Sequence, residues 1–444
     1  MSRARVAATL FLLLAAGEVW AQSARPLRRL RPAPRAEWSI NAELIGVGGA
    51  LTPTASVINP ANRALATPSN EAFLDARADL RWSLGAFKTV ARPRWTGTWT
   101  RVQMDSTVPG GAGEDKTDSE GKADLTDLYA EWQAFPTLQL TAGLLVDGWG
   151  PAEFVNPTNP FFHLTGKSKS FFFKEKGHVF TKMVWTPSMN TSVSLLAEPV
   201  SNNEPSFRQD QSFSPLWAVR GEWQSDSAAV LIGGILGQEA DAASFFGEYL
   251  QLRSDSTGFS VYGEARHTVD AKKFELVNTG GFEQLVEQRR GSSKVDTYSV
   301  LGLRWEGRID ARLEWIHYDL GYTEGEWERL KTALTQLSPY LLENLRRFSR
   351  PGLEFLTQNF WSASVRFPDL GPSSDWQWIN RVLVATGDGA GSAVRSGLFQ
   401  STIEIPVFDA GTLYGEALIN SGTKDTELLL TTEAAYYAGA RWAW

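Results

Sequence analysis

The sequence predicts an all-β fold, a single transmembrane antiparallel up-and-down β-barrel of about 18 strands. Three observations lead to this prediction. Polar and apolar residues alternate along most of the 444-residue chain, and short and long connections alternate between these segments. No stretch approaches the roughly 18 apolar residues that a membrane-spanning helix needs. Two or three soluble domains would also fit the length, but they would not explain one pattern repeated along the whole chain.

The alternation is clearest in residues 74 to 84. Apolar residues hold the even positions, and the odd positions carry polar ones: Asp75, Arg77, Asp79, Arg81 and Ser83. Successive side chains of a strand point to opposite faces, so four charges share one face that lipid would not tolerate. A soluble sandwich would turn this face to bulk water, and a barrel would turn it to a wet interior. Repetition of the pattern favours the barrel.

We predict strands over 37–47, 71–85, 90–104, 122–134, 137–148, 178–186, 190–199, 215–225, 227–238, 244–254, 257–268, 295–306, 309–321, 356–367, 376–386, 397–407, 411–421 and 431–444. Sixteen strands is the alternative count, because 178–186 and 227–238 alternate weakly. Short turns follow the even-numbered strands and longer polar loops follow the odd ones, which is the pattern of periplasmic turns and outer loops. An even count places both termini on the periplasmic side.

The N-terminal segment predicts export. Arg3 and Arg5 precede an apolar run that is too short to span a bilayer, and small residues end at Ala21, so residues 1–21 are expected to be a cleaved signal peptide. Residues 22–36 carry five Arg and three Pro and are expected to form a basic periplasmic tail. This tail is either a solvated lead-in or a docking segment for a periplasmic partner or anionic headgroups. The barrel is expected to occupy residues 37–444.

The last strand, 431–444, alternates strictly and ends on Trp444. It resembles the C-terminal sorting signal of bacterial outer-membrane barrels. This resemblance implies insertion by the barrel-assembly machinery, an integral place in the outer membrane and contact with outer-membrane lipid.

Composition narrows the function. The chain has no cysteine, which excludes a lipid anchor, disulfides and Cys-ligated metal sites, and its net charge of −7 disfavours nucleic acid as a partner. No hydrolase elbow or metalloprotease motif is present, and the spacing of His163, His178, His267 and His317 does not suit a metal. We expect no enzyme and no cofactor, although a Ser–His pair at His178 or His267 stays open because triads are not local in sequence.

Aromatic residues predict the two membrane interfaces. The chain has 18 Trp, and nine of them are expected to face lipid near strand ends: Trp38, Trp82, Trp132, Trp185, Trp223, Trp305, Trp361, Trp442 and Trp444. Sugar stacking is the alternative role for this set. A second set is expected to face inward, as carbohydrate contacts or as filling of the barrel: Tyr129, Tyr262, Tyr318, Tyr414 and Tyr437.

The polar parity of each strand predicts the residues that line the lumen: Arg77, Asp79, Arg81, Arg92, Arg94, Asp127, Tyr129, Glu131, Arg220, Glu222, Glu264, Arg266, Arg304, Glu306, Arg312, Glu314, Arg366, Glu404, Glu416 and Arg441. Arginines and acids are nearly balanced, so the interior is either occluded by salt-bridge packing or a polar conduit. A mixed-charge conduit suits neutral, hydroxyl-rich or weakly charged solutes. Arg92, Arg94 and Arg101 form the local cationic cluster at which an anionic group would dwell.

The loop after the fifth strand, about thirty residues that end at Gly177, is the candidate constriction. Glycines and prolines fix tight turns in its first half, and aromatic and basic residues follow. It either folds inward and narrows the pore or covers the outer mouth. The candidate residues are Asp147, Trp149, Asn156, Asn159, Lys167 and Lys169.

The segment from Gly143 to Pro160 (GLLVDGWGPAEFVNPTNP) resembles the strand-to-loop motif of porin-like barrels grouped with alginate-export channels. Leu144 and Leu145 stand where that family often has Arg-Gln. The resemblance implies passive passage of saccharide-like material, with Asp147, Trp149, Asn156 and Asn159 as matching positions. We therefore predict a channel for polar, saccharide-like cargo, leaning toward exopolysaccharide export with a periplasmic polysaccharide-export partner. The alternatives are a general diffusion porin and, in a different class, an occluded structural or adhesive surface barrel.

Two further loops stand out. Helical spacing in 322–352 predicts two short helices, one on each side of Ser338-Pro339, that form a cap, a gate or a platform for a partner. The acidic stretch 105–121 is expected to be solvated loop, with weak calcium binding as a lesser alternative.

Overall fold

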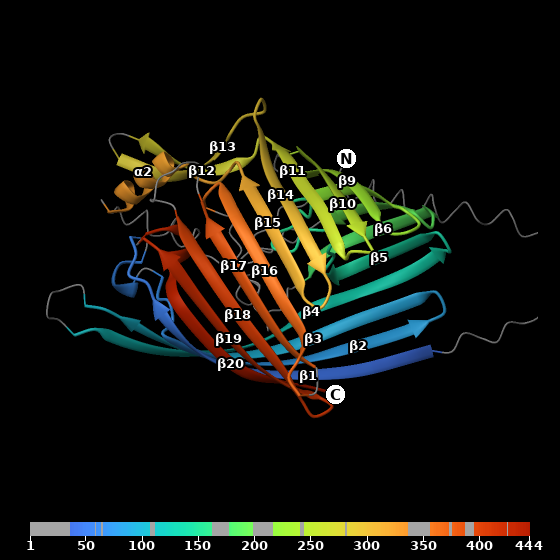
Figure 1. Cartoon of the computed structure of the whole chain (residues 1–444), viewed down its shortest axis with the longest axis horizontal. Helices are drawn as coiled ribbons and strands as arrows, with labels where there is room; N and C mark the ends of the chain where they lie inside the picture. The colour runs from blue at the N-terminus through green and yellow to red at the C-terminus, as the bar shows by residue number, and fades with distance from the viewer. Residues whose placement is uncertain are drawn as a thin grey trace, which may run out of the picture.

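The computed structural model describes residues 36–57, 59–63, 65–106, 112–161, 177–198, 216–239, 244–279, 282–335, 356–372, 375–386, 395–423 and 425–444. Eighteen antiparallel strands of this chain form one sheet that closes on itself (Figure 1). The predicted all-β barrel and its strand count are therefore confirmed. No helix within these ranges is long and apolar enough to cross a bilayer.

The barrel strands are β1 (Ala36–Pro53), β2 (Asn70–Leu84), β3 (Phe87–Met104), β4 (Glu114–Phe135), β5 (Leu138–Leu145), β6 (His178–Ser188), β7 (Thr191–Glu198), β8 (Leu216–Gln224), β9 (Val230–Glu239), β10 (Ser244–Ser254), β11 (Phe259–Val269), β14 (Val295–Glu306), β15 (Asp310–Tyr318), β16 (Asn359–Leu370), β17 (Trp376–Ala385), β18 (Ser396–Val407), β19 (Gly411–Gly422) and β20 (Thr432–Ala443). Each strand pairs with the next along the chain, and β11 pairs with β14. The pairing of β20 with β1, in the register Leu44↔Trp442, closes the barrel. Every predicted strand is present.

One rim of the barrel carries the short turns and both ends of the sheet, and the other carries the long loops. A separate hairpin, β12 (Lys272–Thr279) with β13 (Phe282–Arg289), lies in the long-loop connection between β11 and β14. The sequence analysis did not predict it. Gly280-Gly281 between two alternating runs was the available signal, since such pairs favour tight hairpin turns.

The prediction of a solvated loop over 105–121 was wrong for residues 114–121, which are exposed as predicted but belong to a strand. Strand β4 begins at Glu114, and its first residues pair with β3 as far as Met104↔Glu114. Beyond the hydrocarbon layer the ladder of β3 still offers free backbone groups, and charged side chains on both faces are tolerated there because water meets both. The acidic residues therefore belong to a strand extension.

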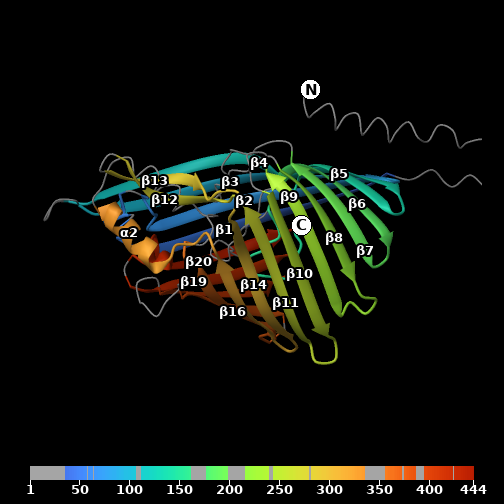
Figure 2. The same ribbon diagram turned by 90° about the horizontal axis from the view of Figure 1, so that it is seen from above.

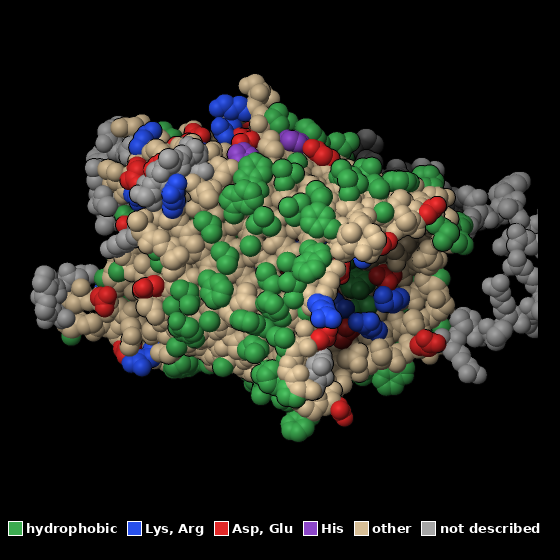
Figure 3. All heavy atoms as spheres, viewed as in Figure 1, with side chains coloured by type: hydrophobic (Ala, Val, Ile, Leu, Met, Phe, Trp, Pro, Cys, Tyr) green, Lys and Arg blue, Asp and Glu red, His purple; other side chains and the backbone are tan. Residues whose placement is uncertain are grey.

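The outer face of the barrel is apolar. Each tryptophan predicted to face lipid is at least 39 % exposed, from Trp82 at 39 % to Trp38 at 74 %. Further tryptophans share this face and were not predicted: Trp95, Trp99, Trp217 and Trp378. Apolar side chains spread over the wall in the space-filling view (Figure 3). Exposure of so much apolar surface is stable only against acyl chains.

The long-loop rim carries a packed cap. Helix α2 (Glu324–Thr335) buries Trp327 and Leu330 against Leu356, Leu430 and the hairpin β12–β13. Helix and hairpin lie together at this end of the barrel (Figure 2). The 3-10 turns η1 (Pro60–Asn62) and η3 (Glu427–Leu429) belong to the neighbouring loops.

The first predicted helix is thus confirmed and packs on neighbouring loops. The second, beyond Ser338, lies outside the described residues.

Substitution of Gly143 in β5 tests how closely the backbones of β4 and β5 pack just before the loop that follows β5. Its φ is +134°, and a Cβ there would lie 2.2 Å from the carbonyl oxygen of Leu128 on β4. We expect Gly143→Ala to lower the free energy of unfolding by more than about 1 kcal/mol, because backbone and not a flexible side chain is in the way. Urea unfolding in detergent measures this. Gly221→Ala on β8, where nothing lies within 4 Å of the added Cβ, is the control and is expected to be harmless.

Docking of α2 should depend on pH through Glu326. Burial opposes ionisation of this carboxylate, but hydrogen bonds from the Thr323 N–H and the Lys273 ammonium prevail and hold its pKa below the usual value. A carboxylate whose pKa is lowered on folding stabilises the folded state at pH values above its ordinary pKa. This stabilisation is lost as the pH falls through the pKa of the folded state. Hydrogen exchange over 324–335, corrected for its intrinsic pH dependence, should therefore rise on acidification.

Glu326→Gln should show raised exchange already at neutral pH. Glu328→Gln, which alters the pair of an exposed carboxylate with Lys331 on the same helix, should leave exchange unchanged. Equal exchange in the two variants would contradict the role of Glu326.

Candidate functional site

Residues 146–161, called the inner loop from here on, fold into the barrel. Trp149 packs against Phe180 and Tyr249 on the inner faces of β6 and β10. Phe154 packs against Ile316 and Phe360 on β15 and β16. A segment that contacts both groups of strands crosses the interior, so the inner loop narrows the lumen and does not lie over the outer mouth.

Local conformation directs this fold. Gly150 has a φ of +86°, and a Cβ there would lie 2.6 Å from Oε2 of Glu264 on β11, so only glycine fits between loop and wall. The Nδ2 of Asn159 donates to the carbonyl of Asp147 at 2.9 Å, and its Oδ1 accepts from the Phe161 N–H at 3.1 Å. These bonds close the inner loop on itself.

Four of the predicted constriction residues are thus placed. The side-chain N–H of Asn156 donates a hydrogen bond to the carbonyl of Ala152. Trp149 lies beneath Arg220 of β8, whose guanidinium is 4.9 Å from the ring centroid. The carboxylate of Asp147 binds Lys182 of β6 at 2.8 Å. With Asn159 they hold the inner loop together, whereas Lys167 and Lys169 lie outside the described residues.

Two carboxylates on the inner face of the barrel wall, Glu264 and Glu314, bind the inner loop. Glu264 is 2 % exposed and accepts hydrogen bonds from the backbone N–H of Thr158 at 2.9 Å and from its hydroxyl at 2.6 Å. Glu314 of β15 is equally buried and accepts from the N–H groups of Glu153 at 2.8 Å and Phe154 at 3.1 Å. Both were predicted as pore-lining residues, and both accept hydrogen bonds from the inner loop.

Glu153 is a charged residue of the inner loop that the sequence analysis did not name as a candidate. Its carboxylate lies 2.7 Å from Nε of Arg312 on β15 and 3.8 Å from Arg381 on β17. Strand parity could not find it, because it lies in a loop. The usable signal was weak: an acid two residues after Pro151, in the segment predicted as the candidate constriction.

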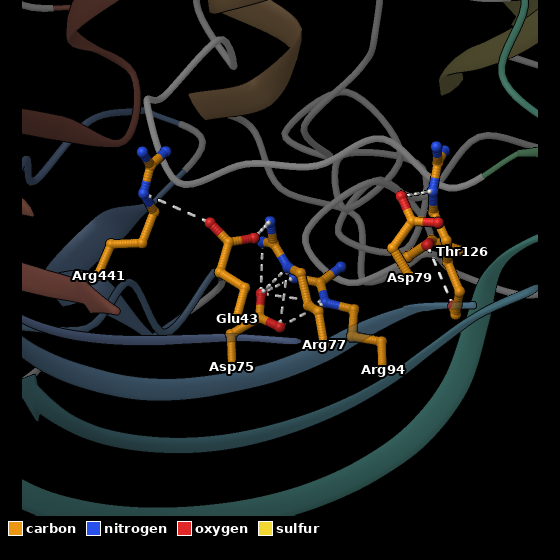
Figure 4. A network of polar contacts seen from close by, with 8 residues as sticks. Glu43, Asp75, Arg77, Asp79, Arg94, Thr126 and Arg441 are labelled. Carbon is orange, nitrogen blue, oxygen red and sulfur yellow. Dashed lines mark hydrogen bonds and ion pairs between the residues drawn. The ribbon is translucent and has the colours of Figure 1, made fainter. Parts of the chain in front are cut away.

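The opposite side of the lumen, formed by the inner faces of β20 and β1–β4, is called the charged wall. Arg77 and Arg94 both lie 2.6 Å from Asp75, which is fully buried between them. Glu43 extends the chain of contacts, at 3.5 Å from both Arg77 and Arg441. Figure 4 shows these side chains rising from neighbouring strands toward the same side. Glu43 and Asp75 were missing from the predicted pore set, although they have its parity.

A second group of the charged wall centres on Asp79. This carboxylate lies 2.7 Å from Arg81 and 3.2 Å from Arg92, and Arg92 also lies 3.1 Å from Asp127. Alternating charges thus share partners, which offsets the desolvation of each.

Arg101 does not join Arg92 and Arg94, contrary to prediction. It pairs with Asp115 on the extension of β4. The reason is parity: Arg101 is an odd number of residues from Arg94 on an extended strand, so it projects from the other face.

The other predicted lining residues make local polar contacts. Glu131 binds Lys88 at 2.9 Å and Glu222 accepts from Tyr249 at 2.6 Å. Arg366 donates to Gln377 at 2.9 Å, and Arg304 lies 2.8 Å from Asp310 and 3.2 Å from Glu306. The remaining members are half-buried or buried on the inner faces of their strands: Tyr129, Arg266, Glu404 and Glu416.

Charged side chains of the lumen keep contact with solvent. Those of Arg81, Arg441 and Glu43 are 48 %, 40 % and 27 % exposed. A hollow opens at the short-turn end of the barrel, and Lys, Arg, Asp and Glu side chains gather in it (Figure 3). Within the described residues, no group of three or more His, Asp or Glu side chains could hold a metal ion.

No protein-family model matches the sequence, and no curated protein matches it. Solved structures do. OccAB1 of Acinetobacter baumannii matches with a TM-score of 0.53 and 8 % identity over 91 % of this chain and 96 % of that chain. OccAB2 of the same organism matches with 0.51 and 10 % over 91 % and 98 %. A BenF-like porin from Pseudomonas fluorescens Pf-5 matches with 0.51 and 8 % over 92 % and 98 %.

At such low identity the likeness shows the fold alone. The fold is that of an integral outer-membrane barrel. The alginate-export resemblance of the segment Gly143 to Pro160 gains no support from these matches.

Asp75 should be the most sensitive charge of the wall. Asp75→Ala leaves Arg77 and Arg94 without their shared buried carboxylate, and we expect a loss of about 3–5 kcal/mol in the free energy of unfolding. Urea unfolding in detergent measures the loss. Asp115→Ala, which breaks the exposed pair with Arg101, is expected to change stability within error. Equal stability of the two variants would contradict the shared-pair account.

Proposed function

We propose that the protein is an outer-membrane channel through which small polar molecules diffuse, between the inner loop and the charged wall. The observation that carries this proposal is the partial exposure of Arg81, Arg441 and Glu43 on an inward face. In a barrel occluded by packed ion pairs, which is the structural or adhesive alternative, such side chains would be buried like Asp75.

The division of the lumen also supports a channel. Apolar clusters around Trp149 and Phe154 fill one side of the barrel, and the charged wall faces the other. A loop that narrows a wet lumen excludes large solutes and forces smaller ones past fixed charges. Because the charged wall alternates in sign, it suits neutral, hydroxyl-rich or weakly charged molecules, of which small saccharides are the proposed cargo.

The general porin is better supported than exopolysaccharide export. Export with a periplasmic polysaccharide-export partner rests on the segment Gly143 to Pro160 alone, and this segment serves to build a constriction. A narrowed lumen suits small solutes better than a polymer. The signal peptide 1–21, the tail 22–36 and insertion by the barrel-assembly machinery remain parts of the proposal.

Reconstitution tests the channel. Purified protein in planar bilayers should give discrete conductance steps, and in liposomes it should admit monosaccharides faster than longer oligosaccharides. Protein unfolded by heat before reconstitution is the control. A folded barrel without conductance would contradict the proposal, and unchanged secreted polymer in a deletion strain would separate uptake from export.

A further inference from the structure

Glu314 is a buried carboxylate of the lumen that, like Glu264, binds uncharged donors of the inner loop. It is 2 % exposed and accepts hydrogen bonds from donors without charge: the N–H groups of Glu153 and Phe154, and the hydroxyl of Tyr262 at 2.7 Å. An ionised carboxylate is acceptor-only and binds N–H and O–H donors strongly. Three donors converge on one buried carboxylate, so Glu314 fixes the backbone of the inner loop at a defined place on the barrel wall.

The residue fixed in this way is the one that carries a charge. The Glu153 side chain is 31 % exposed and reaches Arg312 at 2.7 Å and Arg381 at 3.8 Å. These arginines come from β15 and β17, which lack hydrogen bonds to each other because β16 lies between them. Glu153 therefore adds a carboxylate to two separate cations of the barrel wall: Arg312, which also lies 3.6 Å from Asp310 on its own strand, and Arg381.

We propose that Glu314 is a positioning residue that sets the charge selectivity of the channel. By binding the backbone at Glu153 and Phe154, it holds the Glu153 carboxylate over Arg312 and Arg381. This inference rests on the channel function proposed above. When the hold is lost, the carboxylate leaves, the two guanidinium groups face the passage, and the channel becomes more selective for anions.

The second attachment of the inner loop keeps this effect local. Glu264 binds Thr158, five residues further along, through both its N–H and its hydroxyl. Phe161 packs independently against Phe180 with ring centroids 5.3 Å apart. Loss of Glu314 should therefore release the part of the loop around Glu153 without expelling the whole loop from the lumen.

The variants Glu314→Gln and Glu153→Gln test the proposal. Glutamine keeps the size of Glu314 but turns an amide donor toward N–H donors. Reversal potentials of reconstituted channels in a KCl gradient should show an increase of about twofold or more in the anion-to-cation permeability ratio for either variant, because Arg312 and Arg381 lose the carboxylate that they share. In the double variant the ratio should equal that of Glu153→Gln, since Glu314 acts through Glu153.

Two controls separate positioning from loss of charge. Glu416→Gln also removes one carboxylate from the inner face of the barrel. Glu416 lies on β19, is 5 % exposed and bonds Thr402, so its loss should shift the ratio much less. Tyr262→Phe removes a donor to Glu314 without changing the charge of the lumen, and should shift the ratio in the same direction by a smaller factor. Heat-dependent electrophoretic mobility verifies that each variant is folded.

The outcomes are distinct. Wild-type protein without conductance would overturn the proposed function. A conducting wild type whose Glu314→Gln and Glu416→Gln variants shift equally, or a double variant with additive shifts, would overturn the role of Glu314 and leave the channel intact.

Discussion

The closure of the backbone hydrogen-bond ladder between β20 and β1 is the constraint on which the rest of the structure depends. Hydrocarbon offers no partner to an unpaired N–H or C=O group, so a sheet survives there only without edges. Closure gives every strand one face to lipid and one to the lumen. Successive residues of a strand must then face lipid and lumen in turn, and this is why Leu74 and Trp82 meet acyl chains while Asp75 and Arg77 lie inside.

Closure also brings many charged side chains close together inside the barrel. Many charges point into a confined space, and each needs a partner or water. On the charged wall, carboxylates are shared between arginines of neighbouring strands, and Asp75 is buried completely while Arg81 stays half exposed. On the other side, the inner loop brings its own apolar residues and backbone donors. The lumen thus has one side filled by the inner loop and another on which several charged side chains keep contact with solvent, and this division supports the proposed passage.

The sequence predicted the strands and the faces of their side chains because both follow from a period of two that the membrane enforces. Outside the membrane-spanning part of the barrel, the predicted secondary structure was wrong or incomplete. The β4 extension and the hairpin β12–β13 lie beyond the lipid, where no rule requires alternation. The contacts of Glu153 with Arg312 and of Thr158 with Glu264 also escaped prediction. They join segments more than 100 residues apart, and their geometry depends on the path of a loop.

The same path decides what a carboxylate of the lumen does. Asp79 and Glu314 are alike in chemistry and in strand parity, and a charge count treats them equally. Yet Asp79 lies beside two arginines, whereas Glu314 meets backbone N–H groups that the inner loop delivers. The first neutralises cations directly, and the second does so only through Glu153. Selectivity in such a barrel therefore depends on where the loop places Glu153 as much as on the composition of the wall, and near balance of charges along the strands does not imply balance at the constriction.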